Sequence, residues 1–163
     1  MNKVILLKNR PTGEPTENDF KITKENMPVP GSGEILLKSL YISVDPYLRG
    51  RMRDEESYIE PFEIDKPIES MVIARIEESK NQNFAEGDLV SGMLQWKEYQ
   101  VGSGKSLNKL PKETKQPSAY LGILGLTGLT AYIALDKIGN LSNGETLVVS
   151  GAAGAVEIGR AHV

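Results

Sequence analysis

The stretch LVVSGAAGAVEIGRAHV, residues 147–163, decides which fold class the chain is assigned to. Thr146–Ser150 is short, apolar and β-branched, as in a central strand of a parallel sheet covered on both faces. Gly151 and Gly154 follow at once, and their spacing is a variant of the glycine loop that cradles a dinucleotide. A lone glycine pair is weak evidence, because most such pairs are turns. Glu157 stands where a third glycine is wanted, and its carboxylate would face the phosphates.

The composition of the 163 residues excludes several function classes. The net charge of −3 gives no reason to expect nucleic acid or an anionic membrane surface as partner. The chain has no cysteine and a single histidine, His162, so a catalytic zinc site is not expected. No apolar run is long enough to cross a bilayer. We therefore expect a cytoplasmic protein without a metal site.

Residues 1–116 form short apolar segments separated by turns, which predicts a β-barrel or sandwich. The loop of residues 10–20 is polar and rich in proline and glycine, and it ends at Phe20. The expected strands are Val4–Leu7, Glu34–Val44, Met71–Glu77, Leu89–Leu94 and Glu98–Val101.

The pattern changes after Pro117, where a long apolar segment predicts one buried helix. Ser118 is the expected N-cap and Gly139 the expected C′ residue. Three glycines inside the segment each cost about 1 kcal/mol relative to alanine in a helix. They indicate tight helix packing, close approach of another backbone or of a ligand, or a broken helix, and the residues alone leave these alternatives open.

Four segments together resemble the zinc-independent medium-chain dehydrogenases/reductases. They are YISVDPYLRGRM (41–52), FAEGDLVSG (84–92), YLGILGLTGLTAY (120–132) and GETLVVSGAAGAV (144–156). The branch they resemble contains leukotriene B4 12-hydroxydehydrogenase, prostaglandin reductase and the alkenal double-bond reductases. The resemblance implies an α+β chain with a GroES-like β-barrel, residues 1–116, followed by the truncated start of a Rossmann α/β domain. A linking helix, the first strand and the glycine loop would occupy residues 117–156.

The resemblance also implies an activity and its residues. NADPH would give a hydride to the β-carbon of an α,β-unsaturated aldehyde or ketone, without a metal. Tyr47 matches the family's substrate-side tyrosine, whose phenol can donate a hydrogen bond to the carbonyl; a packed loop tyrosine is the alternative. Asp45 and Arg49 would hold that loop in shape as an ion pair. The expected cofactor-binding residues are Leu126, Thr127, Thr130, Ser150, Gly151, Ala152, Ala153, Gly154, Ala155 and Val156.

Residues 157–163 depart from the family pattern, which continues with glycine into a helix. The codons ATC-GGA-AGA-GCA-CAC-GTC-TGA would encode IGRAHV and a stop, and they match a common sequencing-library adapter. A glycine codon's first G followed by the adapter's AG would give Glu157. We therefore expect an adapter-derived tail and a chain that binds NADPH negligibly, whereas a full-length protein would be a homodimer. The alternative is a genuine short protein or a natural frameshift.

Two other functions remain open at this point. An NADPH:quinone reductase of the same superfamily would share the loop around Tyr47 more loosely. A stand-alone barrel could instead act as a binding module, although no feature of the sequence indicates a partner surface. The residues that distinguish NAD from NADP normally lie about 20 residues beyond the glycine loop.

Overall fold

The computed structural model describes residues 1–55, 59–151, 153–154 and 156–157. The chain divides into two compact units, Met1–Thr114 and Lys115–Val163. All the strands found in the described residues belong to the first unit, and the longest helical segment belongs to the second.

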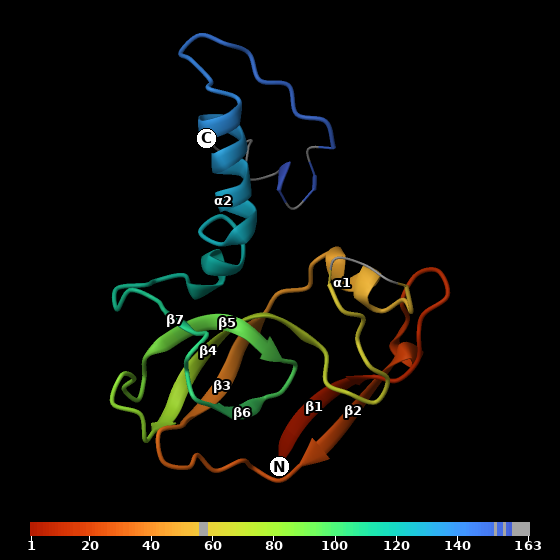
Figure 1. Ribbon diagram of the computed structural model, residues 1–163, viewed down its shortest axis with the longest axis vertical. Coiled ribbons are helices and arrows are strands. Elements are labelled where there is room, and N and C mark those ends of the chain that lie inside the picture. The colour runs from red at the N-terminus through yellow and green to blue at the C-terminus, as the bar shows by residue number, and fades with distance from the viewer. Residues whose placement is uncertain (56–58, 152, 155, 158–163) are drawn as a thin grey trace. The chain divides into compact units, whose positions relative to one another are not determined.

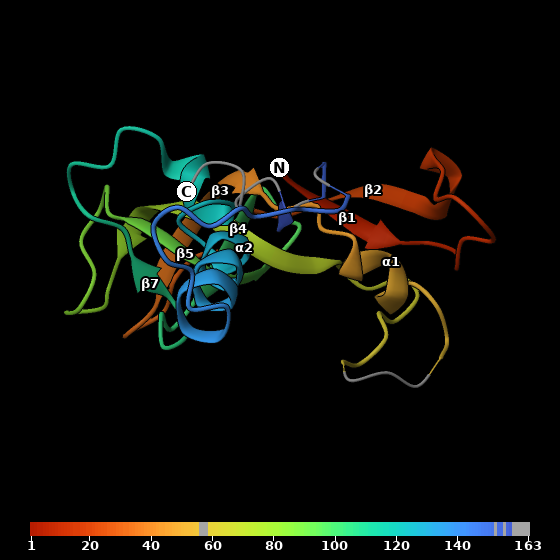
Figure 2. The ribbon, with the colours of Figure 1, turned by 90° about the horizontal axis from the view of Figure 1, so that it is seen from above.

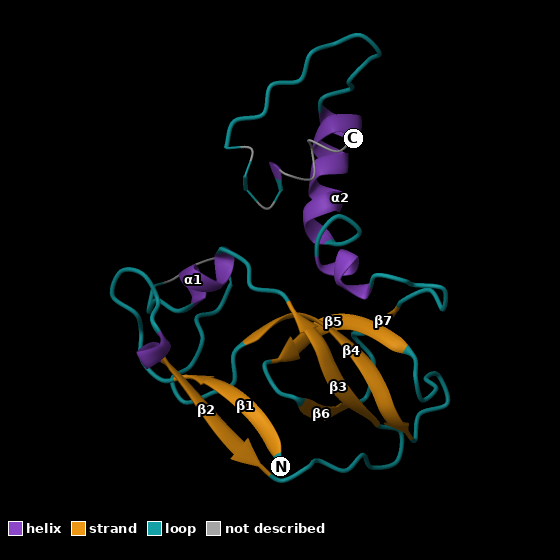
Figure 3. Ribbon diagram, turned by 180° about the vertical axis from the view of Figure 1, so that it is seen from behind, coloured by secondary structure: helices purple, strands orange, loops and turns teal. Residues whose placement is uncertain are grey.

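The first unit contains two antiparallel sheets (Figures 1 and 3). The smaller sheet pairs β1 (Asn2–Leu7) with β2 (Phe20–Glu25). The larger sheet has five strands in the order β6-β3-β4-β5-β7. Its members are β3 (Ile35–Ile42), β4 (Glu69–Ser79), β5 (Leu89–Gln95), β6 (Tyr99–Gly102) and β7 (Asn108–Lys109).

Strand β1 joins the two sheets: one of its edges pairs with β2, and the other contacts residues next to the strands of the larger sheet. Val4 bridges to Lys97 and Leu6 to Pro67. The Ile5 amide donates to the Trp96 carbonyl at 2.9 Å. Because backbone pairing continues from one sheet to the next, the first unit has the barrel-like, strand-rich fold that the sequence predicts.

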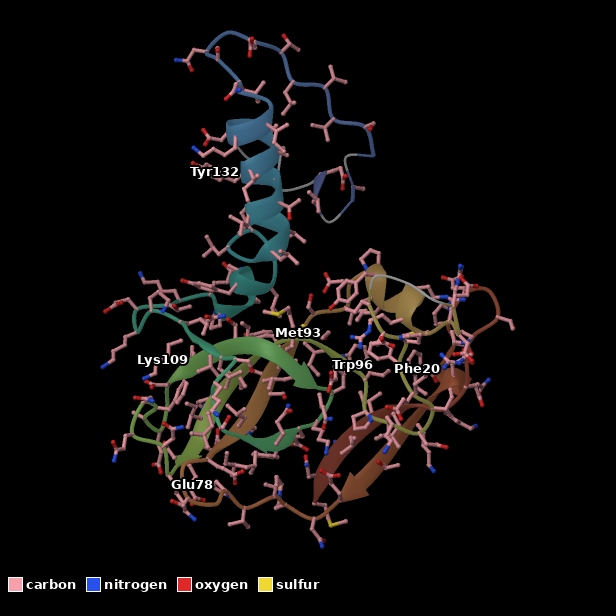
Figure 4. The ribbon with its side chains drawn as sticks, in the orientation of Figure 1. Phe20, Glu78, Met93, Trp96, Lys109 and Tyr132 are labelled. Carbon is pink, nitrogen blue, oxygen red and sulfur yellow. The ribbon has the colours of Figure 1, made fainter. Side chains whose placement is uncertain are left out.

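Two apolar clusters form the core of this unit. Within the larger sheet, one cluster gathers buried side chains of β3, β4 and β5. The other, here called the α1 core cluster, consists of Leu7, Leu48, Met52, Phe62 and Ile68. Phe20, from β2, and Trp96, from the bend just after β5, are labelled in Figure 4 and pack against this second cluster. Burial of each such side chain contributes about 1.5–3 kcal/mol.

The predicted strands of the first unit are confirmed apart from their ends. β3 is shorter than Glu34–Val44, and β4 extends beyond Met71–Glu77 at both ends. Two strands were missed, β2 and the two-residue β7. β2 carries mostly exposed polar side chains, and its place as a partner of β1 is not visible in its own composition.

The single helix expected from Ser118 to Gly139 is wrong, because the segment is broken. A 3₁₀ turn, η2 (Pro117–Leu121), begins it, with Gln116 and not Ser118 as N-cap. Helix α2 (Leu126–Tyr132) follows and continues into a π-helical segment, η3 (Ile133–Ile138). Gly139 caps this end with φ −74°, and the left-handed residue is Asn140 with φ 45°.

Gly128 explains the break. A Cβ atom at this position would overlap the carbonyl group of Ile123. The chain folds back before α2, and the Gly128 amide donates to the Gly122 carbonyl at 3.2 Å. Of the alternatives that the sequence left open, a broken helix is the one that the structure shows. The backbone close to Gly128 belongs to the preceding residues of the same segment.

Two further expectations for the second unit are wrong. The segment 146–150 forms no strand, since it pairs with no other described segment and a strand needs a hydrogen-bonded neighbour. Helix α2 is not buried on most faces: Leu126 is 71% exposed and Leu129 53%. Within α2 the buried residues are Gly128 and Ala131.

Candidate functional site

Tyr47 is the first residue of the short helix α1 (Tyr47–Arg51), which follows β3. The helix lies at the same end of the first unit as the β1–β2 pair (Figures 1 and 2). Leu48 is 2% exposed and anchors the helix in the α1 core cluster. Tyr47 is partly buried and packs against this cluster. Apolar contacts between Tyr47 and the α1 core cluster therefore support the tyrosine.

A chain of hydrogen bonds fixes the residues just before Tyr47. The Trp96 indole Nε1 donates to Ser70 Oγ at 2.8 Å, and Ser70 Oγ donates to the Ser43 carbonyl at 2.7 Å. Ser43 Oγ in turn donates to Asp45 Oδ2 at 2.6 Å. Ser70 is fully buried, so its hydroxyl has lost water and depends on these partners. We call this set the Trp96–Ser70–Ser43 chain.

The expected ion pair between Asp45 and Arg49 is not formed. Asp45 accepts from Ser43, while Arg49 Nη2 donates to the carbonyls of Pro11 at 3.0 Å and Gly13 at 2.7 Å. Carbonyls of an irregular loop need donors, and the fork of a guanidinium can serve two of them at once. Arg49 does hold backbone in place, in the loop between β1 and β2, whereas the contact of Asp45 is with the side chain of Ser43.

Three of the expected cofactor residues lie on α2. Thr127 Oγ1 donates to the Gly122 carbonyl at 2.9 Å, and Thr130 Oγ1 to the Leu126 carbonyl at 2.7 Å. The hydroxyl protons are thus used within the chain, but each oxygen can still accept a hydrogen bond. Leu126 presents an exposed apolar side chain on the same helix.

The glycine loop is partly described: Ala152 and Ala155 lie outside the described residues. Gly151 has φ +61°, the left-handed conformation that favours glycine, and the Gly154 amide donates to the Gly151 carbonyl at 2.8 Å. Ser150, Gly151, Ala153 and Val156 all belong to turns, and Gly154 lies at a bend.

This loop does not fit a dinucleotide diphosphate as it stands. No described strand leads into it, so its backbone amides are not held at the end of a sheet. The carboxylate of Glu157 lies against Gly154, where a Cβ atom would overlap it. A negative charge at this point opposes a diphosphate. The expectation that Glu157 weakens the site is consistent with this geometry.

The predicted site residues fall into two groups. Tyr47 belongs to the first unit, and the predicted cofactor residues belong to the second. Sequence reasoning missed the roles of Arg10, Ser43, Ser70 and Trp96. Arg10, Ser70 and Trp96 act through partners between 26 and 44 positions away, so no local pattern could have indicated them. Ser43 contacts Asp45 only two positions further on, but it is also the acceptor of the distant Ser70.

Among the described residues, two titratable groups have clearly shifted pKa values. A hydrogen bond to Asp136 raises the pKa of Tyr132, a residue of α2 labelled in Figure 4. A hydrogen bond from Lys109, followed by one from the Ala85 amide, lowers the pKa of Asp88. Neither group lies near Tyr47 in sequence. The described residues contain no group of three or more histidines or carboxylates that could hold a metal ion.

The described helices include none that is long and apolar enough to cross a membrane. Residues 3–110 match the family model described as the N-terminal domain of oxidoreductase, and the chain belongs to this family.

Two curated relatives and one solved structure illustrate the similarity. The NADPH-dependent curcumin reductase of Escherichia coli is 41% identical over 155 residues, which cover 95% of this chain and 45% of the relative. The 2-alkenal reductase (NADP(+)-dependent) of Nicotiana tabacum is 42% identical over 160 residues, which cover 95% of this chain and 47% of the relative.

The crystal structure of CurA in complex with NADPH from Vibrio vulnificus is 40% identical and superposes with a TM-score of 0.87. The superposition covers 97% of this chain and 47% of CurA. The chain thus spans about half the length of the proteins it matches.

Proposed function

We propose that the full-length protein uses NADPH to reduce the C=C bond of α,β-unsaturated aldehydes and ketones. The observation that carries this proposal is the support of Tyr47 at the start of α1. Its side chain packs against the α1 core cluster, and the Trp96–Ser70–Ser43 chain holds the backbone four residues earlier. Relatives whose names state NADPH-dependent reductions of an alkenal and of curcumin support it.

NADPH would supply the hydride, which adds to the β-carbon of the enal or enone. Negative charge would then move to the carbonyl oxygen as an enolate, and a proton taken from water at the α-carbon would restore the carbonyl. The Tyr47 phenol donates a hydrogen bond to that oxygen and stabilises the developing charge. No step of this proposal requires a metal.

The cofactor side of the proposal rests on Leu126, Thr127 and Thr130 of α2 and on the glycine loop of residues 150–156. We propose that residues downstream of 156 in the full-length protein supply the remaining strands that the loop needs. The 163-residue chain itself should bind NADPH negligibly, because Glu157 opposes the diphosphate and no strand supports the loop. Titration of the chain with NADPH, followed by nucleotide fluorescence, tests this, and micromolar binding would contradict it.

Residues 157–163 are proposed to be an adapter-derived tail. Sequencing of the genomic locus across codons 150–165 tests this: a glycine codon at 157 and an open frame beyond would support it. A genomic locus that encodes Glu157 and IGRAHV followed by a stop would disprove it. So would recorded codons for residues 157–163 that differ from those of the adapter.

The full-length protein is also proposed to be a cytoplasmic homodimer. Light scattering coupled to size exclusion tests the dimer, and cell fractionation tests the location.

The activity is tested by NADPH oxidation with a small enal, a cyclic enone and a quinone. We expect turnover of the enal and the enone, and Y47F should lower kcat/KM by about 100- to 1,000-fold, the range for loss of one oxyanion donor. Tyr41 is exposed on β3, so Y41F is the matched control and should be unchanged. Preferential turnover of the quinone would favour the quinone reductase alternative, and an unaffected Y47F would remove Tyr47 from the mechanism.

A further inference from the structure

Helix α1 is too short to hold its own position. It has five residues, and Pro46 precedes it without a capping hydrogen bond from its side chain. Isolated helices of this length are unstable in water, because one or two hydrogen bonds do not offset the cost of nucleation. The orientation of Tyr47 must therefore come from tertiary contacts.

Arg49 provides one of these contacts through hydrogen bonds to the loop between β1 and β2. Its Nη2 donates to the carbonyls of Pro11 and Gly13, and its Nε donates to Gly13 at 3.1 Å. Pro11 is buried, so its carbonyl depends more on a donor from the protein than an exposed carbonyl would. The third nitrogen, Nη1, is buried and meets no acceptor among the described residues, so part of the guanidinium has lost water without compensation.

Arg10 makes the reciprocal contact, from the loop to the helix. Its Nη1 donates to the Arg53 carbonyl at 3.0 Å and to the Met52 carbonyl at 3.3 Å, at the C-terminal end of α1. Its Nη2 pairs with Asp54 at 3.0 Å. A cation at this end of a helix satisfies orphan carbonyls and complements the helix dipole.

We infer that Arg10 and Arg49, which we call the arginine clasp, act as positioning residues for Tyr47; this rests on the proposed function. One arginine runs from the helix to the loop, and the other runs from the loop to the helix. The two side chains therefore join the same two segments from opposite directions. The loop of residues 10–16 is therefore a second support for Tyr47, in addition to the Trp96–Ser70–Ser43 chain. A change in the conformation of this loop would change the orientation of the Tyr47 phenol toward the substrate.

Turnover of an enal by the full-length protein tests the clasp. R49M keeps the aliphatic stem and removes the donors, and we expect kcat/KM to fall by about 10- to 100-fold, as for a catalytic group that is displaced by about 1 Å. R49K should recover part of this loss, because an ammonium cannot serve both carbonyls in a fork. R53M is the matched control, since the Arg53 side chain is 54% exposed and pairs with Glu55 at 3.7 Å.

Two further readouts separate positioning from a general loss of stability. The Kd for NADPH should stay within about twofold, since the proposed cofactor residues belong to the other unit and effects at independent sites are separate. The R10M/R49M double variant should lose less than the product of the two single losses, because both residues join the same two segments.

Hydrogen exchange on the 163-residue chain provides a test that needs no turnover. R49K should increase exchange at the Leu48 and Met52 amides and leave the β4 amides unchanged. The inference is overturned if R49M behaves like R53M, if the single losses multiply, or if R49K leaves α1 exchange unaltered. Failure of the proposed function would instead appear as an absence of enal turnover or an unaffected Y47F.

Discussion

The two units of this chain have similar apolar segments but very different burial. In the first unit, Ile35, Ile73 and Val90 are fully buried, and each lies on a strand that pairs with its neighbours. In the second, Val148 is 87% exposed although it lies in an equally β-favouring segment. Apolar composition provides the driving force for burial, but a segment becomes a strand only when a neighbour accepts and donates its backbone hydrogen bonds.

Hydrogen exchange should show the largest contrast between the units. The amides of β4, the central strand of the five-stranded sheet, should exchange only through global unfolding, which requires about 5–15 kcal/mol for a stable domain. Residues 141–150 should exchange close to the rate of an unstructured peptide. Mass spectrometry of peptic peptides measures both, and strong protection of residues 146–150 would mean that the units do not differ in this way.

Truncation of matched apolar side chains should differ by several kcal/mol. I73A removes a fully buried side chain and should lower the free energy of unfolding by about 2–5 kcal/mol. L129A removes a side chain that is 53% exposed on α2 and should change the free energy of unfolding by about 0.5 kcal/mol or less. Urea denaturation measures both values, and equal effects would contradict the comparison.

Removal of the indole donor should have a smaller effect, confined to the first unit. W96F leaves Ser70 Oγ without its donor at a buried position and should cost about 1–3 kcal/mol. The S70A/W96F double variant should cost less than the sum of the singles, because both remove the same hydrogen bond. Additive costs in urea denaturation would show that the Trp96–Ser70–Ser43 chain is not one unit.

The smallest effect on stability concerns Asp88, which contacts Lys109 of β7 in the first unit. Lys109 Nζ lies 2.7 Å from Asp88 Oδ2, and this contact lowers the pKa of Asp88 below its ordinary value of 3.8. A lowered folded-state pKa stabilises the protein above pH 3.8, and the stabilisation is lost as the pH falls through the folded-state value. D88N should remove this pH dependence and cost about 1 kcal/mol or less near neutral pH.

The exposed neighbour Glu86 provides the control for Asp88. E86Q neutralises a carboxylate in the same turn without removing the Lys109 contact, so its unfolding free energy should keep the acid-side pH dependence. Identical pH profiles for D88N and E86Q, measured by urea denaturation between pH 2.5 and 7, would show that the Lys109 contact does not matter.

The sequence predicted the strands whose own residues carry the signal. Met71–Glu77 and Leu89–Leu94 are apolar enough to be recognised without their partners, and both are confirmed. β2 was missed because its side chains are mostly polar and its strand conformation depends on pairing with β1. The break before α2 was left among several alternatives, since the contact between Gly128 and Ile123 depends on a fold-back of the chain.

The candidate site divides in the same way. Tyr47 could be singled out through the segment YISVDPYLRGRM, because a motif is a local property of the sequence. The partners of Arg49 could not be, and the expected pair with Asp45 was wrong. The guanidinium reaches carbonyls 36 and 38 residues earlier in the chain, a distance over which no local pattern operates.

By itself, therefore, the sequence determined the family and the strand-rich character of the first unit, and it singled out the residues that we propose carry the chemistry. Each of these depends on residue type and on spacing along the chain, which the sequence contains in full. The tertiary structure alone decided which apolar segments became strands, where the long helix breaks and what holds Tyr47 in place. These features depend on hydrogen bonds and close contacts between residues that only folding brings together.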